Sequence, residues 1–153
     1  MIINTIGHST KTLEEFTDIL KNFNINFLVD VRRFPSSNTY PHFNKENLQP
    51  KLKELGINYI HYPDLGGFRK EGYEKYAETQ EFRQIIMDML LTVNDRMPAI
   101  MCAELDPTKC HRWFISEVLE EFGYKVMHIT NKDSKPHKEF PRPEKIEIIC
   151  EKD

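Results

Sequence analysis

Residues 97–114 read Met-Pro-Ala-Ile-Met-Cys-Ala-Glu-Leu-Asp-Pro-Thr-Lys-Cys-His-Arg-Trp-Phe. A short apolar run ends at a thiol and a carboxylate, and an Asp-Pro turn follows it. A second thiol, an imidazole and a guanidinium then open a helical pattern. Parallel α/β folds build their sites where a strand leads through such groups into a helix N-terminus. The stretch therefore predicts both the class of the fold and the place of a functional site.

Length, composition and net charge exclude several classes of protein. The 153 residues fit one domain with an ordinary core, and 39% hydrophobic with 29% charged residues is typical of a soluble globular protein. A net charge of −3 argues against bulk binding of nucleic acid or an anionic membrane. No apolar run reaches the length of a membrane span.

Compartment follows from the termini and the cysteines. The first residues carry neither a basic leader nor a small-residue cleavage site, so we expect mature protein from the start. The three cysteines, Cys102, Cys110 and Cys150, are an odd number and do not suggest a disulfide framework. We expect a cytoplasmic protein.

Short apolar runs alternate with helical patterns along the chain. The runs predict five strands, at 2–6, 27–31, 58–62, 99–102 and 125–129. Thr12 and Glu15 form a capping box for the first helix. The next helix begins near Asn44 or Asn47, and Pro50 suits it only in the first turn. Apolar stripes over 82–93 and 115–122 predict two more helices.

This order indicates an α/β fold. We predict a single three-layer domain in which a mostly parallel five-stranded sheet carries helices on both faces. Residues 1–130 form the α/β domain, and 131–153 form a C-terminal tail that packs on it or extends it. Residues 146–150 are a candidate edge strand within that tail. The order of the strands cannot be read from the sequence.

The unusual polar residues collect in four loops that follow predicted strands. These loops are 7–9, 30–33, 61–69 and 102–112. The loops at the opposite edge of the sheet carry little beyond turn residues. Ligands of open α/β sheets bind beyond the carboxyl ends of the strands, so this asymmetry predicts a functional cleft.

Each group in the first three loops has two interpretations. Asp30 either caps a neighbouring loop or contacts a ligand. Arg32 and Arg33 point in opposite directions from extended backbone, so one is structural and the other can hold an anion. Gly66 and Gly67 serve a turn or cradle a phosphate. The two histidines that follow strands, His8 and His61, either bond to nearby backbone or act as bases.

The fourth loop carries the strongest signal. With Asp106 as N-cap and Pro107 at the first helical position, Cys110 lies in the opening turns, where the helix dipole favours a thiolate. We expect Cys110 rather than Cys102 to be the reactive thiol, although both can be core residues. Glu104 is a candidate general acid or base.

Two other chemistries use the same atoms. Zinc or iron could be bound by Cys102, Cys110 and His111, together with His8. The C-x7-C-H spacing, however, lacks the closely spaced ligand pair of common metal sites. A redox pair of the two thiols requires a distance that the sequence does not supply. No cofactor is therefore predicted, with zinc or iron as the alternative.

Four ordered motifs resemble a known family, the domain of unknown function 488 family. They are Thr5-Ile6-Gly7-His8-Ser9, Leu28-Val29-Asp30-Val31-Arg32 with Pro35 and Ser37, Leu65-Gly66-Gly67, and Cys102-Ala103-Glu104 with Cys110-His111-Arg112. The resemblance runs from about Ile3 to Ile129. It implies a compact α/β domain whose cleft is carried by His8, Ser9, Asp30, Arg32, Glu104, Cys110, His111 and Arg112. It implies no particular reaction.

A more distant resemblance is to the rhodanese sulfurtransferases. Residues 28–32 are similar to their early strand, and Cys102 is placed like their nucleophile. After Cys102 the chain departs from them, because a longer segment replaces their short glycine-containing loop. That departure puts a backbone cradle for a persulfide in doubt.

We expect an enzyme, a thiol-dependent transferase or hydrolase, that acts on a small anionic or nucleotide-like substrate. The expected catalytic residues are Cys110, Glu104, His8, Cys102 and Asp30. The expected substrate-binding residues are Ser9, Arg32, Arg33, Ser37, Gly66, Gly67, Arg69, His111 and Arg112. The alternatives are a non-catalytic module that binds a nucleotide or nucleic acid, and a metal-binding domain. No membrane partner is expected, and the oligomeric state is not predicted.

Overall fold

The computed structural model describes residues 1–36, 38–67 and 69–142. Its elements, with η for 3₁₀ helices, are β1 (Ile2–Gly7), α1 (Leu13–Asn22), β2 (Phe27–Asp30), η1 (Pro41–Phe43), α2 (Lys45–Glu54), β3 (Asn58–His61), η2 (Pro63–Leu65), α3 (Tyr73–Ala77), α4 (Gln80–Thr92), β4 (Pro98–Cys102), η3 (Pro107–Lys109), α5 (Arg112–Glu121), β5 (Lys125–Thr130), β6 (Asp133–Pro136) and η4 (His137–Glu139).

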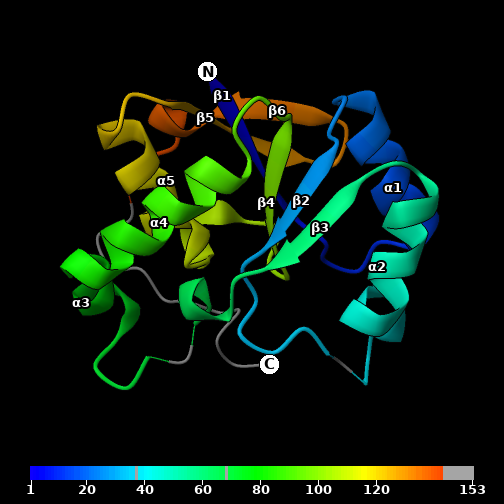
Figure 1. The fold of residues 1–153 in the computed structure, drawn as a ribbon, viewed down its shortest axis with the longest axis horizontal. Coiled ribbons are helices and arrows are strands. Elements are labelled where there is room, and N and C mark those ends of the chain that lie inside the picture. Colours follow the sequence, from blue (N-terminus) through cyan, green and yellow to red (C-terminus); the bar gives the residue numbers. More distant parts are fainter. Residues whose placement is uncertain (37, 68, 143–153) are drawn as a thin grey trace.

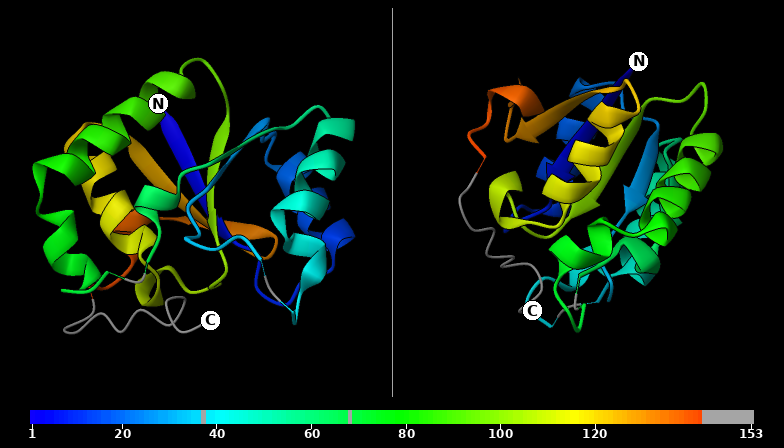
Figure 2. Two further views of the ribbon diagram at one scale, coloured as in Figure 1. Left: turned by 60° about the horizontal axis from the view of Figure 1, so that its bottom comes forward. Right: turned by 90° about the vertical axis from the view of Figure 1, so that its left-hand side faces the viewer.

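A single sheet of six strands forms the centre of the described part of the chain. Its strand order is β3-β2-β4-β1-β5-β6, and all neighbouring pairs are parallel except β5 with β6. Helices α1 and α2 cover one face, and α3, α4 and α5 cover the other (Figures 1 and 2). The predicted α/β class, with a mostly parallel sheet between two helical layers, is confirmed.

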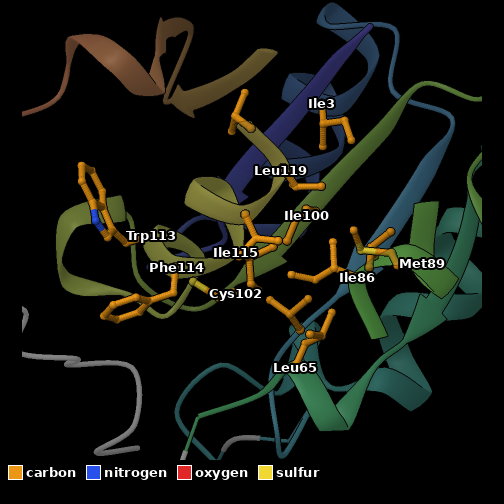
Figure 3. Packing of buried hydrophobic residues seen from close by; sticks show 14 of the residues in the cluster. Ile3, Leu65, Ile86, Met89, Ile100, Cys102, Trp113, Phe114, Ile115 and Leu119 are labelled. Carbon is orange, nitrogen blue, oxygen red and sulfur yellow. The ribbon is translucent and has the colours of Figure 1, made fainter. Parts of the chain in front are cut away.

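Alternation along the strands divides the core into two apolar clusters. In β4, Ala99 and Met101 face α1 and α2, whereas Ile100 and Cys102 face α4 and α5. Figure 3 shows Cys102 beside apolar side chains of α5, among them Ile115. The side chain of Cys102 therefore lies on the α5 side of the sheet.

The topology has a switch point between β2 and β4, and we call the region beyond the carboxyl ends of these two strands the crevice. The connection after β2 leads through α2 to the edge strand β3, and the connection after β4 leads through α5 to β5 on the other side. Neighbouring parallel strands with diverging connections form a crevice at their carboxyl ends, where ligands of α/β proteins bind. Asp30 is the last residue of β2 and Cys102 is the last residue of β4. Both border this crevice.

The sheet has one strand more than the five that we predicted. Strand β6 returns from β5 after a two-residue turn in which Asn131 has a φ of 54°. Its sequence, Asp-Ser-Lys-Pro, is polar and short, so it carries no hydrophobic alternation that would reveal a strand. The predicted edge strand at 146–150 lies outside the described residues.

The four helices expected from the sequence are present as α1, α2, α4 and α5, and Asn44 is the N-cap of α2. The Thr12–Glu15 capping box is present, with both of its hydrogen bonds at 3.0 Å. The expectation for Pro50 was wrong: it lies in the second turn of α2, where its missing N–H leaves the Glu46 carbonyl without an intrahelical donor. The five-residue helix α3 was not predicted. No helix in the described ranges is both long and apolar enough to cross a membrane.

Two glycines allow loops to approach at the level of the backbone. A Cβ on Gly7 would lie 1.9 Å from the Glu104 carbonyl oxygen, and a Cβ on Gly66 would lie 2.5 Å from Arg33 Cα. Gly7 therefore holds the loop after β1 against the loop after β4. Gly66 does the same for the loops after β2 and β3, which gives this glycine a packing role.

We expect Gly7→Ala to lower the free energy of unfolding by about 2–3 kcal/mol, because the added methyl group overpacks a contact made by backbone. Gly56→Ala is the matched control. Its φ is 74° but no atom lies within 4 Å of the added Cβ, so we expect a loss of about 1 kcal/mol. Urea unfolding measures both values. Equal losses would contradict the close approach at Gly7.

Candidate functional site

The site is built around Arg112, the first residue of α5, which is 0% exposed. Its guanidinium donates from Nε to Cys102 Sγ at 3.0 Å and from Nη1 to Thr5 Oγ1 at 2.7 Å. Nη2 donates to the carbonyl oxygens of Glu104 at 2.6 Å and Leu105 at 3.2 Å. Acceptors from β1, β4 and the loop after β4 thus surround one cation.

None of these acceptors is a carboxylate. Within residues 1–36, 38–67 and 69–142, no Asp or Glu forms an ion pair with Arg112. Burial lowers the pKa of Arg112, but the nearby sulfurs of Cys102 and Cys110 outweigh it and leave that pKa above its usual value. A buried charge is expensive without an opposite charge, so the sulfurs are the groups able to balance this guanidinium.

Cys102 lies directly against that cation and is 0% exposed. As a thiol it can donate to the Glu104 carbonyl oxygen, 3.6 Å from Sγ. As a thiolate it accepts the charge-assisted hydrogen bond from Arg112 Nε. Cys102 Sγ thus has a hydrogen-bond partner both as a thiol and as a thiolate, and the adjacent positive charge of Arg112 favours the thiolate.

The predicted place of Cys110 in the opening turns of a helix was wrong. Asp106 and Pro107 do start a helical turn, but it is the 3₁₀ helix η3, with Asp106 Oδ1 accepting from the Thr108 N–H at 2.9 Å. Cys110 then has extended backbone, and α5 begins only at Arg112. Cys110 Sγ accepts from the Arg112 N–H at 3.4 Å, as an N-cap side chain does. The extended residue interrupts what the sequence presents as one helix.

His111 bridges the two sides of the crevice. Its Nε2–H donates to the Val31 carbonyl oxygen at 2.8 Å. Because a carbonyl only accepts, the proton is assigned to Nε2, and Nδ1 remains as an acceptor 3.7 Å from Cys110 Sγ. His111 therefore ties the loop before α5 to the loop after β2.

Asp30 and Arg32 form a closed ion pair on the β2 side. The Arg32 guanidinium donates to both carboxylate oxygens, from Nε at 2.9 Å and from Nη2 at 2.7 Å. The Arg32 backbone N–H and the Tyr59 hydroxyl also donate to Asp30, at 3.0 and 2.5 Å. Burial opposes the charge on Arg32, but Asp30 outweighs burial and raises the pKa of Arg32. With four donors on its two oxygens, Asp30 is suited to positioning Arg32.

Tyr59 and His61 support this pair from β3. Burial first, and then the charge of Asp30, raises the pKa of Tyr59 well above its usual value, so its hydroxyl remains a donor. His61 Nε2 donates to the Arg32 carbonyl oxygen at 2.5 Å. A hollow of about 410 Å³ adjoins them and is lined by Lys45, Gln49, Tyr59, Ile60, His61 and Pro63.

His8 is buried, and Cys102 and the Asp30–Arg32 pair lie near it. Its ring stacks on Phe43 at 4.3 Å, and its Nδ1–H donates to the Ser9 carbonyl oxygen at 3.0 Å. Burial, with a smaller contribution from Arg32, lowers the pKa of His8 to about 4. The ring is therefore neutral at neutral pH, and Nε2 carries its lone pair. Ser9 has a φ of 49° and donates its N–H to the Ala103 carbonyl oxygen.

The other expected site residues make contacts within their own loops or with helix α3. Glu104 Oε1 accepts from the Asp106 N–H at 3.2 Å. The Arg33 guanidinium lies over the ring of Phe34, and that of Arg69 lies over the ring of Tyr76, with centroid distances of 6.0 and 3.7 Å. Gly67 is buried. Ser37 lies outside the described residues.

Five residues at or around these groups were missed by sequence reasoning: Thr5, Lys11, Tyr59, His128 and His137. Lys11 is 8% exposed, and its ammonium has no hydrogen bond or ion pair among the residues that the structure describes. Burial lowers the pKa of Lys11, Glu15 raises it, and the nearby Arg112 lowers it further. For Lys11, the sequence offered one signal of a role in the site, namely its position in the loop after β1.

The metal alternative finds no arranged ligand set. In the part of the chain that the structure describes, no group of three or more His, Cys, Asp and Glu side chains is placed to hold a metal ion.

Comparison with known proteins gives one result. A family model described as "Domain of unknown function DUF488" matches residues 12–119. The search of curated proteins and the search of solved structures each gave no match, so the more distant likeness to the rhodaneses finds no support there.

The buried histidines predict a loss of stability in mild acid. The pKa of His8 is about 4 in the fold against about 6.5 in the unfolded chain, so between these values only the unfolded state binds the proton. Stability is full above pH 6.5 and falls toward pH 4, and His8 contributes up to roughly 3 kcal/mol. His128, whose pKa burial lowers to about 2, also destabilises the fold as the pH falls, and its effect extends to lower pH than that of His8.

Urea unfolding between pH 7 and pH 4 measures this loss in the wild type and in His8→Gln. The variant lacks the contribution of His8 to this loss, so its free energy of unfolding should fall less steeply as the pH is lowered. Parallel curves for the two proteins would contradict the assignment.

Proposed function

The chain belongs to the DUF488 family, and from its site we propose an enzyme that uses a cysteine thiolate on a small anionic or nucleotide-like substrate. One observation carries the proposal: a fully buried guanidinium has two sulfurs, and no carboxylate of the described residues, to balance its charge. The reaction class is transfer or hydrolysis through a covalent sulfur intermediate.

Geometry favours Cys102 over Cys110 as the thiolate. Arg112 Nε lies 3.0 Å from Cys102 Sγ, whereas Cys110 Sγ meets the Arg112 backbone N–H at 3.4 Å. As a neutral thiol, Cys110 can also donate a hydrogen bond to His111 Nδ1. One guanidinium offsets one negative charge, so we assign the thiolate to Cys102. This assignment reverses the order that the sequence suggested.

His8 is the proposed proton acceptor. Its backbone N–H donates to the Cys102 carbonyl oxygen at 2.9 Å, and its neutral ring has the Nε2 lone pair to offer. In the proposed cycle Cys102 Sγ bonds to the electrophilic atom of the substrate, and the leaving group departs with the electron pair. Water or the hydroxyl of an acceptor substrate then gives a proton to His8 and displaces the sulfur, which restores the thiolate; His8 releases that proton to the leaving group or to solvent.

Because Cys102 is fully buried, a substrate reaches it only after a neighbouring segment moves. The loop that follows Cys102 is joined to the loop after β1 by a hydrogen bond from the Ser9 N–H to the Ala103 carbonyl oxygen at 2.9 Å. The carboxylate of Glu104 serves the second of these loops by holding the Asp106 N–H.

Lys11 supports an anionic substrate. Arg32 is already neutralised by Asp30, so it adds little to the field of the site. Arg112 and Lys11 bring two positive charges to the other side, where a Cys102 thiolate supplies one negative charge. The remaining positive charge attracts an anionic group, which would pair with the Lys11 ammonium.

Thiolate absorbance near 240 nm tests the nucleophile. We expect wild type and Cys110→Ser to show one thiolate at pH 6, well below the ordinary thiol pKa of about 8.5, and Cys102→Ser to lose it. Cys150 is present in all three proteins and cancels in their difference. Mass spectrometry after alkylation identifies the residue. Absorbance that first rises near pH 8.5 in every protein would make both thiols core residues and end the proposal.

Inorganic phosphate probes the anion site. We expect phosphate to raise the melting temperature of the wild type and Lys11→Gln to bind it at least about tenfold more weakly, because a charge-assisted hydrogen bond is lost. Lys21→Gln, which changes an exposed lysine on α1, is the control and should bind as the wild type does. Equal affinities in all three proteins would remove Lys11 from the site.

A non-catalytic nucleotide-binding module is the second candidate. The observation that favours it is Phe34, 61% exposed in the loop after β2 with the Arg33 guanidinium over its ring, because such a pair can stack on a base. Phosphate binding through Lys11 in a protein that forms no thiolate would select this candidate.

A further inference from the structure

A row of polar side chains leads from Arg112 through the core to the surface. Thr5 Oγ1, which accepts from Arg112 Nη1, lies 2.5 Å from His128 Nδ1. His128 Nε2 lies 2.8 Å from His137 Nδ1, and His137 Nε2 lies 3.7 Å from Glu117 Oε2. Thr5 and His128 are fully buried, whereas the Glu117 side chain is 37% exposed.

Strand register places the first two members together. Thr5 of β1 and His128 of β5 are paired residues, and their side chains share the α5 face of the sheet with Ile3 and Val126. Polar groups at such positions cost free energy unless every donor and acceptor is paired. Thr5 and His128 are hydrogen-bonded to each other and to neighbours from two other elements, Arg112 of α5 and His137 of η4.

The two ends of the row fix the direction of its hydrogen bonds. At one end Arg112 can only donate, so the Thr5 hydroxyl accepts from it and has its own proton for His128 Nδ1. At the other end Glu117 is a carboxylate, so the His137 nitrogen that faces it carries a proton. His128 then donates from Nε2 to His137 Nδ1. Both rings are neutral Nε2–H tautomers.

The surroundings of the two rings agree with these tautomers. Burial, Arg112 and His137 lower the pKa of His128. Burial lowers the pKa of His137, although Glu117 and Glu120 oppose it. The charges that face His137 come from α5, and Lys138 offsets part of them through its ion pair with Glu120 at 3.8 Å. The Trp113 ring packs on His137 at 4.3 Å.

We propose that Thr5, His128 and His137 are positioning residues that hold Arg112 against Cys102 and connect it, by an oriented hydrogen-bond chain, to Glu117 at the surface. What Arg112 is held for rests on the proposed function, whereas the chain itself does not. The Thr5 hydroxyl can present its lone pair to Nη1 because its proton is engaged by His128. This contact stops the guanidinium from turning, and Nε stays on the sulfur.

Thr5→Val and Thr5→Ser form a matched pair for the first test. Valine keeps the volume and removes the hydroxyl, and serine keeps the hydroxyl. We expect the Arg112 Nε–H signal in NMR spectra to exchange with water at least about tenfold faster in Thr5→Val than in the wild type or Thr5→Ser, because the guanidinium loses an acceptor. Circular dichroism checks that both variants fold. Equal exchange in the two variants would overturn the positioning role.

The histidine tautomers are the second test, read by NMR of protein labelled with ¹⁵N-histidine. At pH 7 the wild type should show His128 and His137 protonated at Nε2 alone. Glu117→Gln should weaken that preference at His137. Glu121→Gln should not, although Glu121 also lies on α5 and pairs with Arg83 at 2.6 Å. A proton on His128 Nδ1 in the wild type would overturn the oriented chain.

The two proposals fail separately. If the tautomers and the Arg112 exchange are as expected but no thiolate forms, the positioning chain stands and the thiolate enzyme does not. If a thiolate forms on Cys102 and Thr5→Val leaves both it and the Arg112 exchange unchanged, the enzyme stands and the positioning inference falls.

Discussion

The structure depends on one buried cation that has no carboxylate partner in the described ranges. Arg112 collects acceptors from β1, β4 and the loop that follows β4, and its own backbone begins α5. The relative positions of these elements are therefore tied to one side chain. A buried guanidinium costs several kcal/mol unless its neighbours compensate it, and an apolar residue would fill the same space more cheaply. In the proposed function its role is to hold the adjacent sulfur of Cys102 as a thiolate.

The crevice has two sides that differ in charge. On the β2 side Asp30 and Arg32 neutralise each other. On the β4 side the cations are Arg112 and Lys11; Glu15 acts on Lys11, and the proposed Cys102 thiolate would offset the charge of Arg112. His111 joins the sides through the Val31 carbonyl oxygen. A paired charge attracts a ligand weakly and an unbalanced one attracts it strongly, so the β4 side is where an anion should settle.

Sequence patterns predicted what depends on local periodicity and chain direction. Short apolar runs located five strands, and the rule that sites lie beyond the carboxyl ends of parallel strands directed attention to the ends of β2 and β4. Contacts between distant residues carry no such pattern. Tyr59 reaches Asp30 from β3, and Thr5 with His128 occupies strand positions that looked like ordinary core. Cys110 was misplaced because the end of a 3₁₀ turn depends on packing more than on capping residues.

The contacts of Arg112 extend beyond the residues that the family model matches. Residues 12–119 include the cation, both thiols and Glu117, but exclude Thr5 and His128. Strand β1, which supplies Thr5, lies between β4 and β5 and is one of the central strands of the sheet. Without β1 the guanidinium would lose an acceptor and β4 would lose a neighbour. The matched region holds Cys102 and Arg112, whereas His8 and Lys11, which the proposed function also uses, lie before it. The proposed site therefore needs β1 and the loop that follows it as well as the matched region.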